Sequence, residues 1–226
     1  MLLGFAFAVA ASAQTRVGVP LPAAHGASEK SLVARAQSSL DAKQWPDAEA
    51  ALKQLVSSEP RWEYSEALGN AQINQCHYED SIASFQRAID MAQKDATPAA
   101  IGRMYTTVGN ANLKLKRNDA AIAAYNKAAA LDPNPAVAYF KICATLYNVG
   151  ETVKTLAACD KAIAADPKKA DAYFVKGSVM VGQGAVGKNG KMTVPPGTVE
   201  TLKQYLALAP DGGHANEVKE MLDFLK

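Results

Sequence analysis

The chain has 226 residues, with 24 Lys and Arg against 22 Asp and Glu and a net charge of +2. Such a balance excludes a nucleic-acid binder that works by bulk positive potential, and 49% hydrophobic with 20% charged residues excludes disorder driven by charge. Alanine contributes 44 residues, a proportion that favours closely packed helices.

The N-terminal residues 1–13 read MLLGFAFAVAASA, a short apolar run that ends in the small-x-small motif cut by signal peptidase. This pattern predicts a secretory signal peptide, and therefore export, with the bacterial periplasm as the expected compartment. The run is too short to span a bilayer, which needs about 20 apolar residues, so no stable membrane insertion is expected once the signal is removed. The run departs from the full signal-peptide pattern, because no Lys or Arg precedes it. An uncleaved interfacial anchor stays open as an alternative.

Residues 14–28 contain several Gly and Pro and lack helical periodicity, which predicts a flexible linker. Beyond it the chain repeats itself. Residues 102–135 read GRMYTTVGNANLKLKRNDAAIAAYNKAAALDPNP, and residues 136–169 read AVAYFKICATLYNVGETVKTLAACDKAIAADPKK. Tyr105 and Tyr139 match at a distance of 34 residues, as do Ala128 and Ala162. A fixed period of this length is typical of repeat architectures.

The block 102–135 resembles the tetratricopeptide repeat (TPR) family, whose pattern is an aromatic residue, Leu-Gly, Ala, a second aromatic, Ala and a closing Pro. Those places hold Tyr105, Val108-Gly109, Ala121, Tyr125, Ala128 and Pro133. Small residues let two antiparallel helices approach closely, and proline stops the second helix. The resemblance implies an all-α fold, a right-handed α-solenoid of about five helical hairpins with a concave face.

The repeat pattern extends over residues 29–61, 62–95, 102–135, 136–169 and 170–210, so the TPR domain is expected at 29–226. The fifth repeat contains an inserted loop at about 185–197. Its glycines have the letters of a phosphate-binding loop but lack the strand and helix that such a loop needs, so we interpret it as an exposed loop or a small hairpin. The last segment, 213–226, has apolar residues at helical spacing and predicts a cap helix.

The sequence contains no residue pattern that indicates catalysis or metal binding. His25, His77 and His214 have no carboxylate or cysteine at metal-ligand spacing, and no nucleophile stands at the spacing of a base. We therefore predict no enzyme, no cofactor and no metal site.

Two of the three cysteines lie at the same distance from the turn of one predicted helical hairpin. Cys143 and Cys159 are equidistant from residue 151, the middle of the turn Gly150-Glu151-Thr152, so antiparallel helices place both thiols side by side. A disulfide and a pair of buried free thiols both stay open at this stage. Cys76 would be left unpaired.

The resemblance also implies a ligand groove, because the family exposes fixed positions of each first helix on the concave face. The candidates at those positions are Asn70, Asn110, Phe140, Tyr147 and Phe174. The asparagines match those that grip the backbone of an extended peptide, and the aromatics would form an anchor pocket. Ordinary packing is the alternative for both sets.

The function expected from these features is a non-catalytic TPR scaffold that mediates protein–protein or protein–peptide interaction in the cell envelope through its concave groove. The alternative is a self-associating structural or assembly subunit with no separate peptide ligand. No nucleic-acid partner is expected. The clamp that binds chaperone tails is also not expected, because Asp171 and Val175 stand where it needs basic residues.

Overall fold

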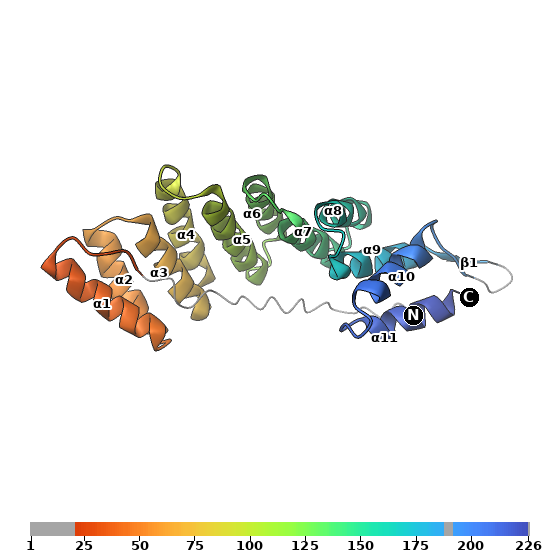
Figure 1. The fold of residues 1–226 in the computed structure, drawn as a ribbon, viewed down its shortest axis with the longest axis horizontal. Helices are drawn as coiled ribbons and strands as arrows, with labels where there is room; N and C mark the ends of the chain where they lie inside the picture. Colours follow the sequence, from red (N-terminus) through yellow and green to blue (C-terminus); the bar gives the residue numbers. More distant parts are fainter. Residues whose placement is uncertain (1–20, 188–191, 226) are drawn as a thin grey trace. The chain divides into compact units, whose positions relative to one another are not determined.

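The computed structural model describes residues 21–187 and 192–225 (Figure 1). The predicted signal peptide, 1–13, and residues 14–20 of the predicted linker lie outside the described residues. The described chain is helical apart from one short two-stranded hairpin, which confirms the predicted all-α class. None of the described helices combines the length and the apolar character that a membrane span needs.

The chain forms two compact units, the first ending at Asp132 and the second beginning at Pro133. The first unit contains α1 (Ala27–Asp41), α2 (Trp45–Ser58), α3 (Trp62–Asn74), α4 (Tyr78–Ala92), α5 (Pro98–Lys114) and α6 (Asn118–Leu131). The second contains α7 (Ala136–Asn148), α8 (Thr152–Ala165), α9 (Ala170–Gly182), β1 (Ala185–Val186), β2 (Met192–Thr193), α10 (Thr198–Leu208) and α11 (Ala215–Phe224). Within each unit, successive helices pair as hairpins that follow one another along the chain (Figure 1).

A glycine in the first helix of a hairpin faces a large side chain from the second helix. A Cβ atom added at Gly109 would lie 2.3 Å from the Tyr125 ring, and one added at Gly69 would lie 2.8 Å from the Phe85 ring. The same contact recurs in the second unit between Gly177 and Leu202, at 2.5 Å. The glycine of the repeat pattern is therefore required by the close approach of the two helices.

The turns inside the hairpins share a left-handed residue. It is Lys43 (φ 56°) after α1, Cys76 (φ 62°) after α3, Lys116 (φ 58°) after α5 and Gly150 (φ 79°) after α7. A left-handed residue at this place ends a helix by satisfying its last carbonyl groups, and glycine adopts the conformation without strain. Three of the four turns therefore hold a residue that is strained there.

The described end of the predicted linker contacts the first unit. The Leu21 backbone N–H donates to Gln37 Oε1 at 3.0 Å, and Arg61 Nη1 donates to the Ala23 carbonyl at 3.0 Å. Residues 21–26 are thus anchored to the first two hairpins, and α1 already begins at Ala27.

The insertion in the fifth repeat forms the small hairpin that the sequence left open as an alternative. β1 and β2 pair antiparallel, with Ala185 opposite Thr193 and Val186 opposite Met192. Gly197, with φ 83°, then provides the left-handed residue that leads into α10.

Candidate functional site

The predicted asparagines lie in the first unit, Asn70 on α3 and Asn110 on α5, and both are half-buried. The Tyr125 hydroxyl donates to Asn110 Oδ1 at 2.9 Å. Burial raises the pKa of Tyr125, so its hydroxyl keeps the proton that this bond requires. Asn110 therefore holds its own hairpin together, a role that the sequence did not reveal.

The predicted aromatic residues lie in the second unit and have different neighbours. Phe174 is only 1% exposed. The His214 ring stacks on it with centroids 3.9 Å apart and planes at 10°, and the Tyr205 centroid lies 5.7 Å away. Phe174 therefore follows the packing alternative that the sequence left open, because His214, which precedes α11, covers its ring.

Phe140 lies against a basic side chain. Lys169 Nζ lies 5.0 Å from the Phe140 ring centroid, within the range of a cation–π contact, and 3.5 Å from Asp171 Oδ2. Burial and the neighbouring Lys169 lower the pKa of Lys141. Phe140 is thus half-buried under a basic side chain.

Tyr147 lines a pocket of about 240 Å³ that lies among α7, α8 and α9. The lining residues are all uncharged: Tyr147, Gly150, Thr152, Thr155, Ser178, Val179, Gly182 and Gln183. Tyr147 is the twelfth residue of the fourth repeat and Ser178 the ninth of the fifth, both groove positions of the pattern. We call this site the α7–α9 pocket.

Two hydroxyl groups of the α7–α9 pocket donate to their own helices, and of these Thr155 is fully buried whereas Ser178 is half-buried and can accept from a ligand. Thr155 Oγ1 donates to the Glu151 carbonyl and Ser178 Oγ to the Phe174 carbonyl, each at 2.9 Å. A hydroxyl that donates to its own helix still has a lone pair for an incoming N–H group. Burial raises the pKa of Tyr147, with nearby Glu217 as a second cause, so its hydroxyl is protonated at neutral pH. The pocket is therefore suited to uncharged groups that carry N–H donors.

Sequence reasoning identified Tyr147 but missed most of the pocket's other lining residues. Thr152, Thr155 and Gln183 lie in the second helix or at helix ends, outside the groove positions of the pattern. Thr155 carried no signal in the sequence, because Ser81 and Thr198 place a hydroxyl at the same position of two other hairpins.

A disulfide joins Cys143 on α7 to Cys159 on α8 in the structure, with the two Cα atoms 5.1 Å apart. Both residues are fully buried. The bond crosslinks two of the three helices that form the α7–α9 pocket. Cys76 is a free thiol, exposed in the α3–α4 turn.

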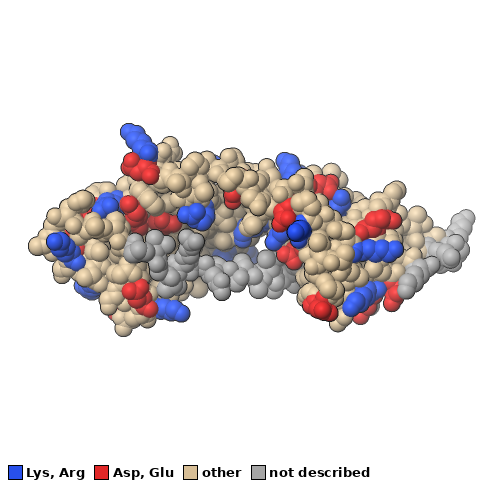
Figure 2. Space-filling model, viewed as in Figure 1, with Lys and Arg blue, Asp and Glu red and all other residues tan. Residues whose placement is uncertain are grey.

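Charged side chains of both signs are mixed over the surface. Figure 2 shows Lys and Arg interspersed with Asp and Glu on the visible face of both units. This mixture agrees with the near-neutral net charge and contrasts with the uncharged lining of the α7–α9 pocket.

Two family models match the chain. A model described as a tetratricopeptide repeat matches residues 33–100, and one described as a TPR repeat matches residues 109–150. None of the curated proteins compared with the chain matches it.

Solved structures share the fold at low sequence identity. MamA from Desulfovibrio magneticus RS-1 is 18% identical with a TM-score of 0.64, covering 84% of this chain and 99% of that one. YrrB, described as a TPR protein with an unusual peptide-binding site, is 19% identical with a TM-score of 0.61, covering 82% and 88%. A tetratricopeptide repeat protein from Parabacteroides merdae ATCC 43184 is 15% identical with a TM-score of 0.66, covering 88% and 74%. These similarities concern the fold.

Proposed function

Because the chain is a tetratricopeptide repeat protein, we propose that it binds an extended peptide segment of a protein partner in the α7–α9 pocket. Domains of this family generally mediate protein–protein interaction, and the family's proteins are non-catalytic scaffolds, in agreement with the prediction that the chain is not an enzyme. The observation that carries the proposal is the pocket itself, which includes groove positions of two successive repeats.

The chemistry of the pocket indicates what it accepts. Its lining is uncharged and offers the half-buried Ser178 hydroxyl as an acceptor, so an uncharged side chain together with a backbone N–H group fits it best. A Lys, Asp or Glu side chain would lose its hydration there without finding an opposite charge. The proposed ligand is therefore a peptide whose inserted residue is uncharged.

We further propose that this interaction takes place after export, in the bacterial cell envelope. Two observations support that compartment: the apolar N-terminal run with its small-x-small motif, and a buried disulfide, which persists in oxidising environments. Fractionation of bacteria that express the full chain tests the proposal. A mature protein that starts at Gln14 and is released with the periplasm is expected; an uncleaved chain in the cytoplasmic fraction would contradict it.

Two glycine variants test the pocket. A Cβ atom added at Gly182, which lines the pocket, meets nothing within 4 Å, so Gly182→Leu projects a side chain into the space without disturbing the fold. Gly213 is equally open but lies outside the pocket, and Gly213→Leu is the matched control. Peptides selected from a random display library on the wild-type chain should bind Gly182→Leu at least tenfold more weakly by fluorescence polarisation and bind the control equally. Equal affinity for both variants would refute the assignment of the pocket.

Self-association is the second candidate function. Its candidate contacts are two exposed apolar side chains of the second unit, Val153 at 78% and Phe224 at 68% exposure. Light scattering of the purified chain over a range of concentrations distinguishes a stable oligomer from a monomer.

A further inference from the structure

Glu49 departs from the internal pattern of the repeats. The small residue in the first turn of each second helix is Ala48, Ser81, Ala121, Thr155 or Thr198, and the residue after it is aliphatic in four hairpins: Ile82, Ile122, Leu156 and Val199. In the first hairpin this residue is Glu49, which is only 7% exposed. A carboxylate is costly to bury unless it is well paired, so its presence at an aliphatic position requires a reason.

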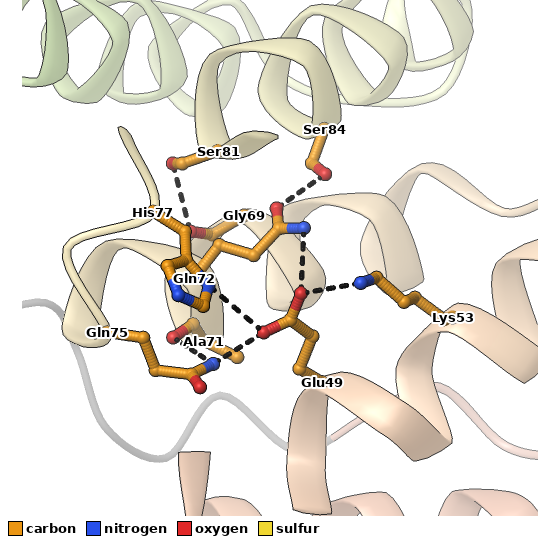
Figure 3. Close-up of polar contacts among 9 residues, drawn as sticks. All are labelled: Glu49, Lys53, Gly69, Ala71, Gln72, Gln75, His77, Ser81 and Ser84. Carbon is orange, nitrogen blue, oxygen red and sulfur yellow. Dashed lines mark hydrogen bonds and ion pairs between the residues drawn. The ribbon is translucent and has the colours of Figure 1, made fainter. Parts of the chain in front are cut away.

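The Glu49 carboxylate is held in place from two sides (Figure 3). Its Oε1 atom accepts from Lys53 Nζ at 2.8 Å and from Gln72 Nε2 at 3.3 Å. Its Oε2 atom accepts from Gln75 Nε2 at 2.6 Å. Ser84 Oγ donates to Gln72 Oε1 at 2.7 Å and so orients the amide. Carboxylates that bind metal ions are likewise oriented by hydrogen bonds from neighbouring residues.

Glu49 is ionised at neutral pH. Burial by itself raises the pKa of its carboxyl group, but hydrogen bonds from Lys53, Gln72 and Gln75 outweigh that effect and hold the pKa below the ordinary value. The fold therefore presents a fixed negative charge between α2 and the α3–α4 turn.

Two further donor atoms face this charge. His77 Nδ1 lies 3.5 Å from Glu49 Oε2 (Figure 3), and a carboxylate oxygen of Asp80 lies within 4.8 Å of both. Zn²⁺ binds imidazole nitrogen and carboxylate oxygen at about 2.0–2.2 Å, which places tetrahedral ligands about 3.4 Å apart. The His77–Glu49 separation is long for a hydrogen bond but close to this value. Asp80 is exposed, so a change of rotamer can bring its carboxylate nearer.

We propose that Glu49, His77 and Asp80 form a Zn²⁺ site that joins the first hairpin to the second. Glu49 comes from α2, His77 immediately precedes α4 and Asp80 lies in the first turn of α4, so a bound ion would crosslink the two hairpins. The nitrogen ligand favours Zn²⁺ over Mg²⁺ and Ca²⁺, which prefer oxygen ligands alone. The site is distinct from the α7–α9 pocket and does not depend on the proposed peptide function.

Lys53 is the competing cation at this site. Its ammonium group is 2.8 Å from Glu49 Oε1 and also interacts electrostatically with Asp80. Bound Zn²⁺ would be repelled by this charge, so removal of the charge should strengthen Zn²⁺ binding. Lys53→Met keeps most of the side-chain length and provides this test.

The experiment is isothermal titration of the full chain with zinc chloride at neutral pH. We expect one ion per wild-type chain, at least tenfold weaker binding for His77→Ala and for Asp80→Asn, and tighter binding for Lys53→Met. The His77 and Asp80 side chains are exposed, so neither change should impair folding, and thermal unfolding without metal verifies this.

Two control variants separate this site from other zinc ligands. His214 Nδ1 lies 3.3 Å from Glu217 Oε2, a similar His–carboxylate pair, and Cys76 is an exposed thiol beside His77. Neither His214→Ala nor Cys76→Ser should change the affinity. The proposal is overturned if zinc binds both His77→Ala and Asp80→Asn as tightly as the wild type, or if either control variant loses zinc binding. It is also overturned if neither the wild type nor Lys53→Met binds zinc at 1 mM, a concentration on the order of a thousandfold above the dissociation constant of a micromolar site.

Discussion

Replacing Gly109 with alanine tests the packing rule of the repeat. A Cβ atom at this position would lie 2.3, 2.6 and 2.9 Å from three carbon atoms of the Tyr125 ring. The ring cannot move away easily, because Tyr125 is fully buried and its hydroxyl donates to Asn110. Overpacking of this kind costs about 1–3 kcal/mol. Alanine returns about 1 kcal/mol through its higher helix propensity, so a net destabilisation of up to about 2 kcal/mol is expected.

The same helix contains a matched control. At Gly102 an added Cβ would lie 3.4 Å from the nearest atom, an ordinary contact, so Gly102→Ala should be neutral or stabilise α5 by up to about 1 kcal/mol. Urea unfolding followed by circular dichroism gives both free energies. In a Tyr125→Leu background, Gly109→Ala should cost less than it does in the wild type, because the smaller side chain leaves room for the methyl group. If Gly109→Ala were as stable as Gly102→Ala, the close helix approach would not be what requires glycine there.

Three further predictions concern the disulfide, an acidic contact and a turn. Reduction of Cys143–Cys159, which are 16 residues apart, should lower the unfolding free energy by about 3 kcal/mol in urea titrations, and equal curves with and without reductant would contradict this. Hydrogen bonds from the His25 backbone and the Tyr64 hydroxyl hold the pKa of Glu29 below its ordinary value of 4.5, so their stabilisation is present above pH 4.5 and is lost as the pH falls through the lowered pKa. Tyr64→Phe should therefore flatten the acid side of the stability–pH curve, and an unchanged slope would argue against this contact. Lys116→Gly should raise stability by about 1 kcal/mol in thermal unfolding, because glycine adopts the left-handed turn without strain, whereas a lower melting temperature would refute the strain argument.

The architecture was predictable because its causes are local and recur from one hairpin to the next. The close contact of Gly109 with Tyr125 repeats as Gly69 with Phe85, so one physical requirement is visible several times in the sequence. The family matches and the helix pairs agree with this expectation. A periodic signal therefore identifies the hairpins even where individual residues deviate.

The candidate sites were less predictable because they depend on residues that break the period. His214 follows the last repeat, and its stacking on Phe174 depends on how the chain turns back after α10. A pattern of groove positions cannot show that one of them is covered by a segment outside the pattern. The α7–α9 pocket similarly includes Thr152 and Gln183, which come from helix ends rather than groove positions.

Glu49 shows most clearly how periodic and spatial information differ. The sequence around His77 does not point to Glu49, because α3 separates the two residues along the chain. The prediction of no metal ligand beside His77 also passed over Asp80, three residues further on. The sequence shows that Glu49 stands where the other repeats have an aliphatic residue, but it does not show which residues contact Glu49. The repeated sequence pattern determines how helices pair within a hairpin, because those contacts join residues that are close in the chain. The neighbours of the buried Glu49 carboxylate are decided by the tertiary structure, because they come together only when one hairpin packs against the next.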